Sequence, residues 1–331
     1  MSQQPDIRRL TAEIEEGMAF ASALTAGMAR VIVGQHHLVR SLLTGLLSGG
    51  HLLLEGVPGL AKTRAVKTLA ALIKADFSRI QFTPDLLPAD VVGTVVYSQR
   101  TEQFCVRRGP VFAHFVLADE INRAPAKVQS ALLEAMEEHQ VTIGDETFRL
   151  PEPFLVLATQ NPVEQEGTYP LPEAQTDRFM LKVIVDYPTA EQEQSIIHNH
   201  LLTEDIVLQP VADTQTIARA RTLLRQVYID ERVERYIVDL VRATRELDAY
   251  GLKSLAHYVD YGASPRAGIN MALASRAVAM LEGRGYVIPD DVKSIAADVL
   301  RHRISLSYEA EADNVGSDQV ISEILSKVKV P

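Results

Sequence analysis

The sequence predicts an α/β fold with a mostly parallel sheet and β-hairpin insertions, followed by an all-α region. Three observations predict it. From Gly50 to Pro188, short apolar runs alternate with helical patterns. Two segments within this part have the pattern of hairpins. After Pro188, apolar residues recur at helical spacing alone.

Five short apolar runs are candidate strands. They are His51–Leu54, Phe77–Phe82, Phe115–Leu117, Leu155–Ala158 and Leu181–Val185. Helical patterns such as "PAKVQSALLEAMEE" lie between them. Uniformly apolar strands that alternate with helices are typical of a parallel sheet covered on both faces. The two hairpin candidates are "VVYSQRTEQFCVRRG" and "QVTIGDETFRL".

The part after Pro188 contains five segments with helical spacing, several of which have Pro or Asp near their start. They are "PTAEQEQSIIHNHL", "TQTIARARTLLRQV", "ERVERYIVDLVRATREL", "SPRAGINMALASRAVAML" and "PDDVKSIAADVLRHRI". We therefore expect two domains: an α/β domain over residues 1–188 and an all-α domain over residues 189–331.

Composition restricts the possible partners and the location. The 331 residues carry a net charge of −10, whereas nucleic-acid binding usually requires a basic surface. The one cysteine, Cys105, excludes an internal disulfide and fits a reducing compartment. The N-terminus lacks the basic-then-apolar order of a signal peptide, and the segment from Met18 to Val33 is interrupted by Arg30. We expect a cytoplasmic protein without a membrane span.

The stretch "GVPGLAKT", Gly56–Thr63, lies between an apolar run and a helical pattern. A phosphate-binding loop is usually spelled G-x-x-x-x-G-K-[ST], and Ala61 here replaces the second glycine. Gly56 and Gly59 would let the backbone approach the phosphates, Lys62 would supply the charge and Thr63 a metal ligand. Ala61 is acceptable if its φ is negative. On this stretch alone, a structural turn remains an alternative.

Two further polar groups follow apolar strands. "HFVLADE" ends in Asp119 and Glu120, which could hold Mg²⁺ through water and polarise an attacking water, respectively. The alternative is a helix N-terminus, where acids suit the helix dipole. "FLVLATQNP" ends in Thr159-Gln160-Asn161, and an amide there could hold the attacking water or a phosphate oxygen. Asn161 before a proline is also a common turn residue.

Long stretches of this chain together resemble the MoxR family of AAA+ ATPases. They are "VIVGQ", "GGHLLLEGVPGLAKT", "QFTPDLLPADVVGT", "ADEINRAPAKVQSALLEAMEEHQVTI", "ATQNPVEQEGTYPLPEAQTDRFM" and "SPRAGI". Alanine before the lysine is usual in that family, which favours the phosphate-binding interpretation. The resemblance implies an AAA+ core with an α-helical lid, ATP hydrolysis, and ATP and Mg²⁺ as ligands.

The resemblance also assigns roles by position. The predicted nucleotide-binding residues are Gly56, Val57, Pro58, Gly59, Leu60, Ala61, Lys62 and Thr63 around the phosphates, with Val33, Gly34 and Gln35 against the adenine. Thr63 and Asp119 are the predicted metal ligands, and Glu120 is the predicted catalytic residue that polarises the attacking water. Asn161 matches the first sensor, Arg266 the second, and Arg178 the arginine finger that reaches a neighbouring subunit. Arg123 is a weaker candidate for an interface arginine. The two hairpins match insertions that are usually directed toward a central pore.

Several functions are compatible with these motifs. The resemblance implies a chaperone-like ATPase, in a ring that is expected to be hexameric, acting on partner proteins with von Willebrand factor A domains. One alternative is the motor subunit of a metal-chelatase-like complex, which shares this architecture. Another is a DNA-directed motor, against which the acidic composition counts. A small-molecule kinase would share the fold but has no need of a trans-acting arginine.

Overall fold

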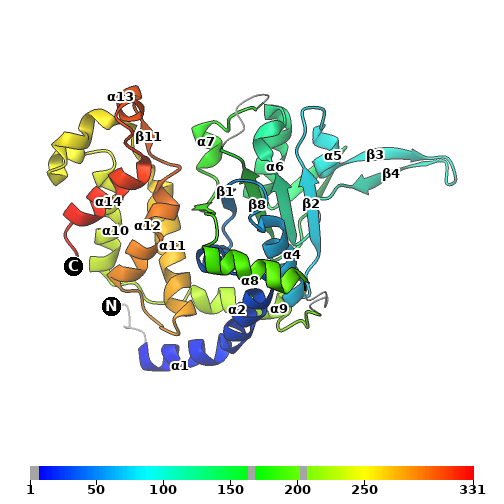
Figure 1. Cartoon of the computed structure of the whole chain (residues 1–331). Helices are drawn as coiled ribbons and strands as arrows, with labels where there is room; N and C mark the ends of the chain where they lie inside the picture. The colour runs from blue at the N-terminus through cyan, green and yellow to red at the C-terminus, as the bar shows by residue number, and fades with distance from the viewer. Residues whose placement is uncertain (1–6, 163–167, 202–206) are drawn as a thin grey trace. The chain divides into compact units, whose positions relative to one another are not determined.

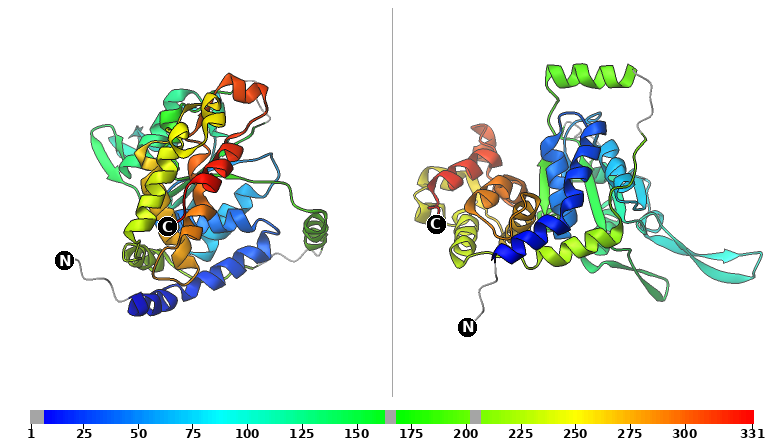
Figure 2. Two further views of the ribbon diagram at one scale, coloured as in Figure 1. Left: turned by 90° about the vertical axis from the view of Figure 1, so that its left-hand side faces the viewer. Right: turned by 90° about the horizontal axis from the view of Figure 1, so that it is seen from below.

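The computed structural model of the chain describes residues 7–162, 168–201 and 207–331 (Figures 1 and 2). Its contacts divide the chain into two compact units. The first, the core unit, comprises Phe20–Phe179 and Val183–Ala218. The second, the helical unit, comprises Met180–Lys182, Arg219–Pro331 and the described part of Met1–Ala19. The boundary that we expect between the two domains, after residue 188, remains a prediction.

The chain forms a five-stranded sheet in the order β2-β5-β8-β1-β9, which belongs to the core unit except for the first two residues of β9. The strands are β1 (Leu52–Glu55), β2 (Phe77–Gln81), β5 (Phe115–Asp119), β8 (Leu155–Gln160) and β9 (Leu181–Ile184). β5 pairs in parallel with β2 and β8, and β8 pairs in parallel with β1. The first four residues of β5 and the first five of β8 are buried, as expected for central strands of a covered parallel sheet. All five predicted strands are confirmed to within a few residues.

The two faces of the sheet pack against different helices. Leu53, Val116 and Val156 share one apolar cluster with Val128 and Leu132 of α6 (Ala126–Glu138). Successive strand residues point to opposite faces, so Leu52 lies on the other side. There, Gly45 of α3 (His36–Ser48) approaches Leu52 so closely that a side chain at 45 would collide with it.

Further helices precede, follow or lie between the strands of the sheet. They are α2 (Ala19–Val31), α4 (Lys62–Leu72), α5 (Pro88–Val92), the 3₁₀ turn η1 (Ile121–Arg123), α7 (Glu173–Thr176), α8 (Ala190–Leu201) and α9 (Thr214–Leu224). In α2 the residues Ala21, Leu24 and Met28 are buried at helical spacing. In the described part of the chain, no helix combines the length and apolar character needed to cross a bilayer.

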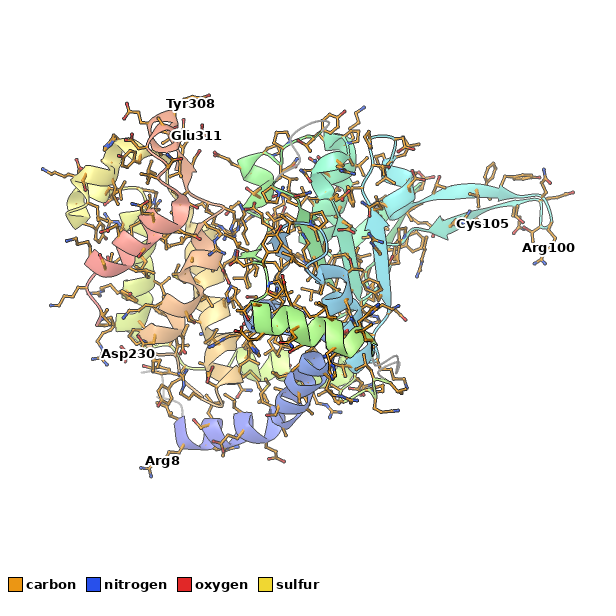
Figure 3. All side chains as sticks on the ribbon, in the orientation of Figure 1. Arg8, Arg100, Cys105, Asp230, Tyr308 and Glu311 are labelled. Carbon is orange, nitrogen blue, oxygen red and sulfur yellow. The ribbon has the colours of Figure 1, made fainter. Side chains whose placement is uncertain are left out.

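Both predicted hairpins form. One joins β3 (Gly93–Ser98) to β4 (Gln103–Arg108), and the other joins β6 (Gln140–Ile143) to β7 (Glu146–Arg149). Figures 1 and 2 show the β3–β4 hairpin projecting away from the five-stranded sheet. The exposed rings of Tyr97 and Phe104 face each other across it, with centroids 5.3 Å apart. Cys105 is also exposed on this hairpin (Figure 3).

The helical unit is built mainly from α1 (Ile7–Gly17), α10 (Glu231–Ala243), α11 (Pro265–Leu281), α12 (Pro289–Leu300), α13 (Tyr308–Ala312) and α14 (Ser317–Lys327). The 3₁₀ turns η2 (Leu247–Tyr250) and η3 (Lys253–Tyr258) lie between α10 and α11. Prolines occupy the first positions of α11 and α12, where the missing N–H costs no helical hydrogen bond. The helices predicted after Pro188 are thereby confirmed. The region is not wholly helical, because β10 (Val259–Tyr261) and β11 (Ser305–Leu306) form a short antiparallel pair.

Candidate nucleotide site

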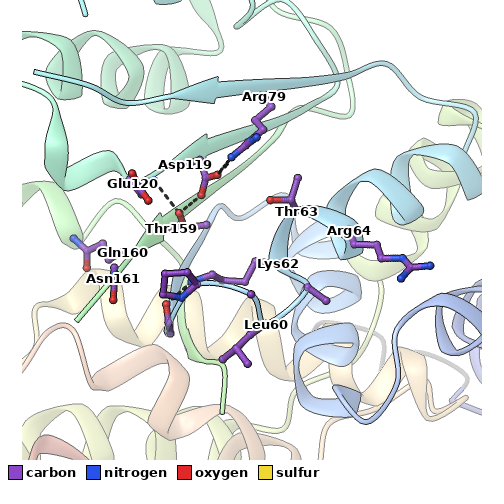
Figure 4. A pocket seen from close by; sticks show the side chains of 14 residues that line it. Leu60, Lys62, Thr63, Arg64, Arg79, Asp119, Glu120, Thr159, Gln160 and Asn161 are labelled. Carbon is purple, nitrogen blue, oxygen red and sulfur yellow. Dashed lines mark hydrogen bonds and ion pairs between the residues drawn. The ribbon is translucent and has the colours of Figure 1, made fainter. Parts of the chain in front are cut away.

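The loop between β1 and α4 encloses one side of a cavity of about 370 Å³ (Figure 4). Of the predicted phosphate-binding residues, Gly56 and the run from Pro58 to Thr63 line this cavity, whereas Val57 does not. Gly59 has φ 90°, which glycine adopts without strain. At Gly56, a Cβ atom would lie 2.6 Å from the carbonyl oxygen of Val185. The loop therefore needs its first glycine for close packing and its second for backbone conformation.

Lys62 is the first residue of α4 and lies partly buried in the cavity wall. Its Nζ donates a hydrogen bond to the carbonyl oxygen of Gly56. Burial lowers the pKa of the Lys62 ammonium group, while the negative charges of Asp119, Glu120 and Glu55 act in the opposite direction. A desolvated cation beside a helix N-terminus favours the binding of an anion.

The conformation of Ala61 differs from the expectation. Its φ is 57° and its ψ 17°, which places it in the left-handed region and not at a negative φ. This conformation crowds the Cβ atom of an L-residue and costs roughly 1–2 kcal/mol. The usual glycine of such loops avoids that cost. The condition placed on Ala61 from the sequence was wrong, and the loop accepts alanine with backbone strain.

The predicted acids lie on the opposite side of the same cavity, at the end of β5. Asp119 Oδ1 accepts a hydrogen bond of 2.6 Å from the hydroxyl of Thr159, at the end of β8. The same hydroxyl accepts a hydrogen bond of 2.9 Å from the backbone N–H of Glu120. Glu120 has φ 57°, so the chain turns sharply directly after Asp119. Both acids line the cavity across from the loop, and the Glu120 side chain makes no capping bond to the 3₁₀ turn that follows it.

Asn161 and Gln160 also line the cavity, and Asn161 is 8% exposed. Gln160 is the last residue of β8 and Asn161 follows it; the pairing of β8 with β1 sets Gln160 beside Glu55. The strand ends therefore bring the loop, the acid pair and the amide to one edge of the sheet, as the sequence predicts.

Two side chains of the site were missed by the sequence analysis. Arg79 of β2 lines the cavity and makes an ion pair with Asp119, with Nη2 2.5 Å from Oδ2. Gln81, two residues further on, donates a hydrogen bond of 2.8 Å from its Nε2 to Glu120 Oε2. A partial signal was present, because Arg79 and Gln81 are two positions apart and therefore share one face of β2.

Comparisons with known proteins agree with this geometry. The chain matches the "ATPase family associated with various cellular activities (AAA)" over residues 51–181 and the "AAA lid domain" over residues 254–324. It is 50% identical to the chaperone MoxR1 of Mycobacterium tuberculosis over 91% of this chain and 80% of that protein. It is 30% identical to the protein MoxR of Paracoccus denitrificans, over 85% and 87% of the two chains.

The chain belongs to the MoxR family of AAA+ ATPases. A crystal structure of a candidate ATPase from Cytophaga hutchinsonii has a similar fold, with a TM-score of 0.90, 48% identity and coverage of 98% of each chain. The predicted family, fold class and ATPase activity are confirmed, and a nucleotide is the ligand of such a domain.

Other residues that MoxR proteins lead us to expect at the nucleotide lie outside the lining of this cavity. Gly34, which has φ 78°, packs against the side chain of Gln192. Gln35 donates a hydrogen bond of 2.9 Å from Nε2 to the carbonyl oxygen of Asp186. Val33 adjoins them in the chain, and all three residues belong to the core unit. Their contact with adenine stays a prediction.

The predicted arginines take three different positions. Arg178 pairs with Glu137 of α6 at 3.1 Å, beside a second cavity of about 250 Å³ that also includes Glu134 and Glu138. Arg266 lies in the first turn of α11, in the helical unit. Arg123 pairs with Glu120, with Nη1 3.0 Å from Oε2. Their roles at a subunit interface or in a lid stay predictions.

The donor set fits Mg²⁺. Thr63 and Asp119 offer a hydroxyl and a carboxylate to the same cavity. In the described part of the chain, this cavity included, His, Cys, Asp and Glu form no group of three that could hold a metal ion. Mg²⁺ in nucleotide sites commonly takes one or two protein oxygens and completes its shell with phosphate and water. Thr63 at the end of the loop and Asp119 across the cavity are therefore sufficient as protein donors.

The left-handed Ala61 leads to a test of loop strain. Ala61→Gly should raise the free energy of unfolding by up to about 1 kcal/mol, because relief of the left-handed conformation exceeds the extra chain entropy of glycine. Ala65→Gly, in the buried helical backbone of α4, should lower it by about 1 kcal/mol or more. Denaturant unfolding of the two variants measures both. A loss of stability in Ala61→Gly similar to that in Ala65→Gly would contradict the strain at position 61.

Proposed function

We propose that this ATPase binds Mg²⁺-ATP in the cavity between the β1–α4 loop and the ends of β5 and β8. It uses hydrolysis to remodel, activate or mature partner proteins in the cytoplasm. The observation that carries the proposal is that Lys62, Asp119, Glu120 and Asn161, distant in sequence, line one cavity. A partly buried lysine facing a pair of acids is suited to a ligand that is both anionic and metal-bound.

Each side chain has a role in this proposal. The backbone N–H groups of the loop and Lys62 bind the phosphates, and Lys62 exchanges its bond to the Gly56 carbonyl for a phosphate oxygen. Thr63 and Asp119 hold Mg²⁺, which neutralises charge on the phosphates when bound. Glu120 accepts the proton of the attacking water, and Asn161 orients that water or the γ-phosphate.

We further propose that the active form is a ring, with six subunits as the expected number. Arg178 would reach the nucleotide of the neighbouring subunit, since it does not line the cavity of its own chain. Its pair with Glu137 is partly exposed, with side-chain exposures of 32% and 42%, so exchanging it for a phosphate costs little. Arg266 would sense the nucleotide from the lid, and Val33, Gly34 and Gln35 would contact the adenine.

The client is expected to be a protein with a von Willebrand factor A domain. The name of the relative in Mycobacterium tuberculosis, a chaperone, supports action on other proteins. The projecting β3–β4 hairpin offers exposed apolar contacts through Tyr97 and Phe104. The net charge of −10 gives no support to a DNA-directed motor.

Two substitutions separate binding from chemistry. Lys62→Ala should abolish tight ATP binding, because the phosphates lose their direct counter-ion. Glu120→Gln should bind ATP normally and hydrolyse it about 10²–10⁴-fold more slowly, because the proton acceptor is lost. Calorimetric ATP titration and phosphate release measure the two effects. Unchanged affinity in a folded Lys62→Ala protein, or hydrolysis at the parent rate in Glu120→Gln, would contradict the assigned roles.

The proposed ring leads to a test by mixing. Arg178→Ala should bind ATP but lose about 10³–10⁵-fold in hydrolysis, the effect of arginine fingers in this class of ATPase. Mixed with Glu120→Gln, it should regain part of the activity, because some interfaces then join an intact Glu120 to an intact Arg178. Phosphate release from the mixture measures the recovery.

The matched control carries both substitutions in the same chain and is mixed with Glu120→Gln. No interface in that mixture joins an intact Glu120 to an intact Arg178, so activity should stay at the level of the separate variants. If mixed rings form and the first mixture shows no more activity than this control, Arg178 does not act between subunits.

The proposed partner class leads to a binding test. Glu120→Gln with ATP should hold a purified von Willebrand factor A domain protein from the same organism in a stable complex, because the ring cannot complete its cycle. Lys62→Ala should not hold it, since that variant lacks the ATP-bound state. Size-exclusion chromatography detects the complex. Equal binding by both variants would show that the nucleotide does not control the interaction, and binding by neither would contradict this class of partner.

A further inference from the structure

Two arginines that follow α12 bind the backbone at the start of β9. Arg301 donates a hydrogen bond of 2.8 Å from Nη1 to the carbonyl oxygen of Lys182. Arg303 donates one of 3.2 Å from Nη1 to the carbonyl oxygen of Met180. Lys182 lies in β9 and Met180 directly precedes that strand. These two contacts, called the β9 clasp below, hold the chain at the point where it enters the sheet.

The clasp lies on the outer edge of the five-stranded sheet. β9 is the last strand of the sheet, beside β1. Val185, directly after Ile184, donates its backbone N–H to the carbonyl oxygen of Glu55 in β1 at 2.8 Å. Successive residues of a strand direct their backbone groups to opposite edges, so the carbonyl of Lys182 faces away from β1. An open sheet edge needs a cover, and Arg301 supplies a donor to it.

Burial makes the clasp firm. The side chain of Arg301 is 9% exposed and also pairs with Asp298 at 2.7 Å and with Asp318 at 2.9 Å. Arg303 is 9% exposed as well, and its Nη1 also donates to a backbone carbonyl of α12. A buried guanidinium that loses a carbonyl partner leaves a donor unsatisfied, which is costly. In agreement, the contacts of the chain group Met180–Lys182 with the helical unit.

The clasp is adjacent to Arg178 in the chain. Phe179 is the one residue between Arg178 and Met180, and its ring is fully buried in the apolar cluster of the core unit. The backbone N–H groups of Arg178 and Phe179 donate to the carbonyls of Gln175 and Thr176, at 3.2 and 3.1 Å. The backbone that carries Arg178 is therefore fixed by the core unit on one side and by the clasp on the other. So short a connection leaves no loop to absorb a displacement.

We propose that Arg301 and Arg303 position Arg178 for its action on the neighbouring subunit, so that the helical unit of one chain supports hydrolysis in the next. This rests on the proposed function, because it takes Arg178 as the arginine that reaches the neighbour's nucleotide. Arg301 and Arg303 are positioning residues, and neither needs to touch the nucleotide.

The distance dependence of catalysis explains why such support matters. Arg178 has to leave Glu137, with which it pairs at 3.1 Å, and bind a phosphate oxygen in another chain. A misplacement of about 1 Å can cost about 100-fold in rate. The side chain of Arg178 can rotate about its own bonds, but its starting point is set by the backbone. Loss of the clasp would spread the positions of the guanidinium without removing it.

The helical unit also carries Arg266, so the clasp could instead serve the nucleotide site of its own chain. These two possibilities place the effect of a broken clasp in different chains of a mixed ring. If the clasp positions Arg178, the effect belongs to the chain that supplies the arginine. If it serves its own site, the effect belongs to the chain that hydrolyses ATP.

Mixed rings distinguish the two. The reference mixture combines Glu120→Gln, which supplies Arg178, with Arg178→Ala, which supplies Glu120. Arg303→Met removes the donor to Met180 and keeps an unbranched side chain. In the Glu120→Gln chain it should lower phosphate release about 10–100-fold below the reference mixture. The KM for ATP should not change, because the other chain hydrolyses the ATP. In the Arg178→Ala chain, phosphate release should stay within about twofold of the reference.

A matched control separates positioning from general weakening of the helical unit. Arg284→Met removes an arginine of the same unit whose guanidinium bonds to Asp291 and to the carbonyl of Tyr286. In either chain of the mixture it should leave phosphate release within about twofold of the reference, because it is independent of the clasp. Thermal unfolding measures the stability of each variant, and size-exclusion chromatography sets the mixtures to equal ring content.

A second variant breaks the other half of the clasp. Arg301→Lys keeps a positive charge beside Asp298 but loses the planar fork that reaches the carbonyl of Lys182 at the same time. It should reduce phosphate release only when it is in the Glu120→Gln chain. It provides the test if Arg303→Met does not fold.

The outcomes are distinct. A loss that follows the Arg178→Ala chain, or that is equal in both placements, would overturn the positioning of Arg178. No loss in either placement, or an equal loss with Arg284→Met, would also overturn it. If the reference mixture itself recovers no activity, the trans-acting Arg178 of the proposed function is refuted, and the positioning with it.

Discussion

The in-register pairing of parallel strands β5 and β8 is the constraint on which the site depends. It sets Ala118 beside Ala158, and the next residues along the two strands, Asp119 and Thr159, form a hydrogen bond. The Thr159 hydroxyl also accepts the backbone N–H of Glu120, so one side chain fixes both the direction of a carboxylate and the sharp turn after it. A slip by one residue would turn every side chain of the strand to the opposite face and separate these groups.

The acids beside the cavity lie against cations of the same chain. Arg79 lies against Asp119, Arg123 against Glu120, and Lys62 against a backbone carbonyl. Two acids brought together in a partly buried place would otherwise repel each other. The ligand of such a site therefore replaces contacts that already exist, and its affinity reflects the difference between two sets of interactions.

Much of the fold followed from local patterns in the sequence. Apolar runs located the five strands, because a strand buried on both faces is apolar throughout. Helical spacing located the helices after Pro188, because a helix buried on one face has apolar residues every three or four positions. The pair β10–β11 was missed, since Val259–Tyr261 and Ser305–Leu306 are too short to show a periodicity and lie far apart in the chain. In the site, the loop and acids were predictable from motif spacing. The sign of φ at Ala61 and the contacts that Arg79 and Gln81 make with the acids depend on tertiary structure, because the spacing in β2 indicates only that these two side chains share a face.

The chain has a single cysteine, and it lies exposed on the projecting β3–β4 hairpin. A thiol-reactive dye would therefore attach at one known place in the unaltered protein, away from the phosphate-binding loop and the acid pair. No other thiol has to be removed first. In an assembly of several copies, the same position would report the spacing between equivalent hairpins by energy transfer. Cys105, which does not line the nucleotide cavity, is thus a convenient place from which to observe the hairpin as nucleotide binds and leaves.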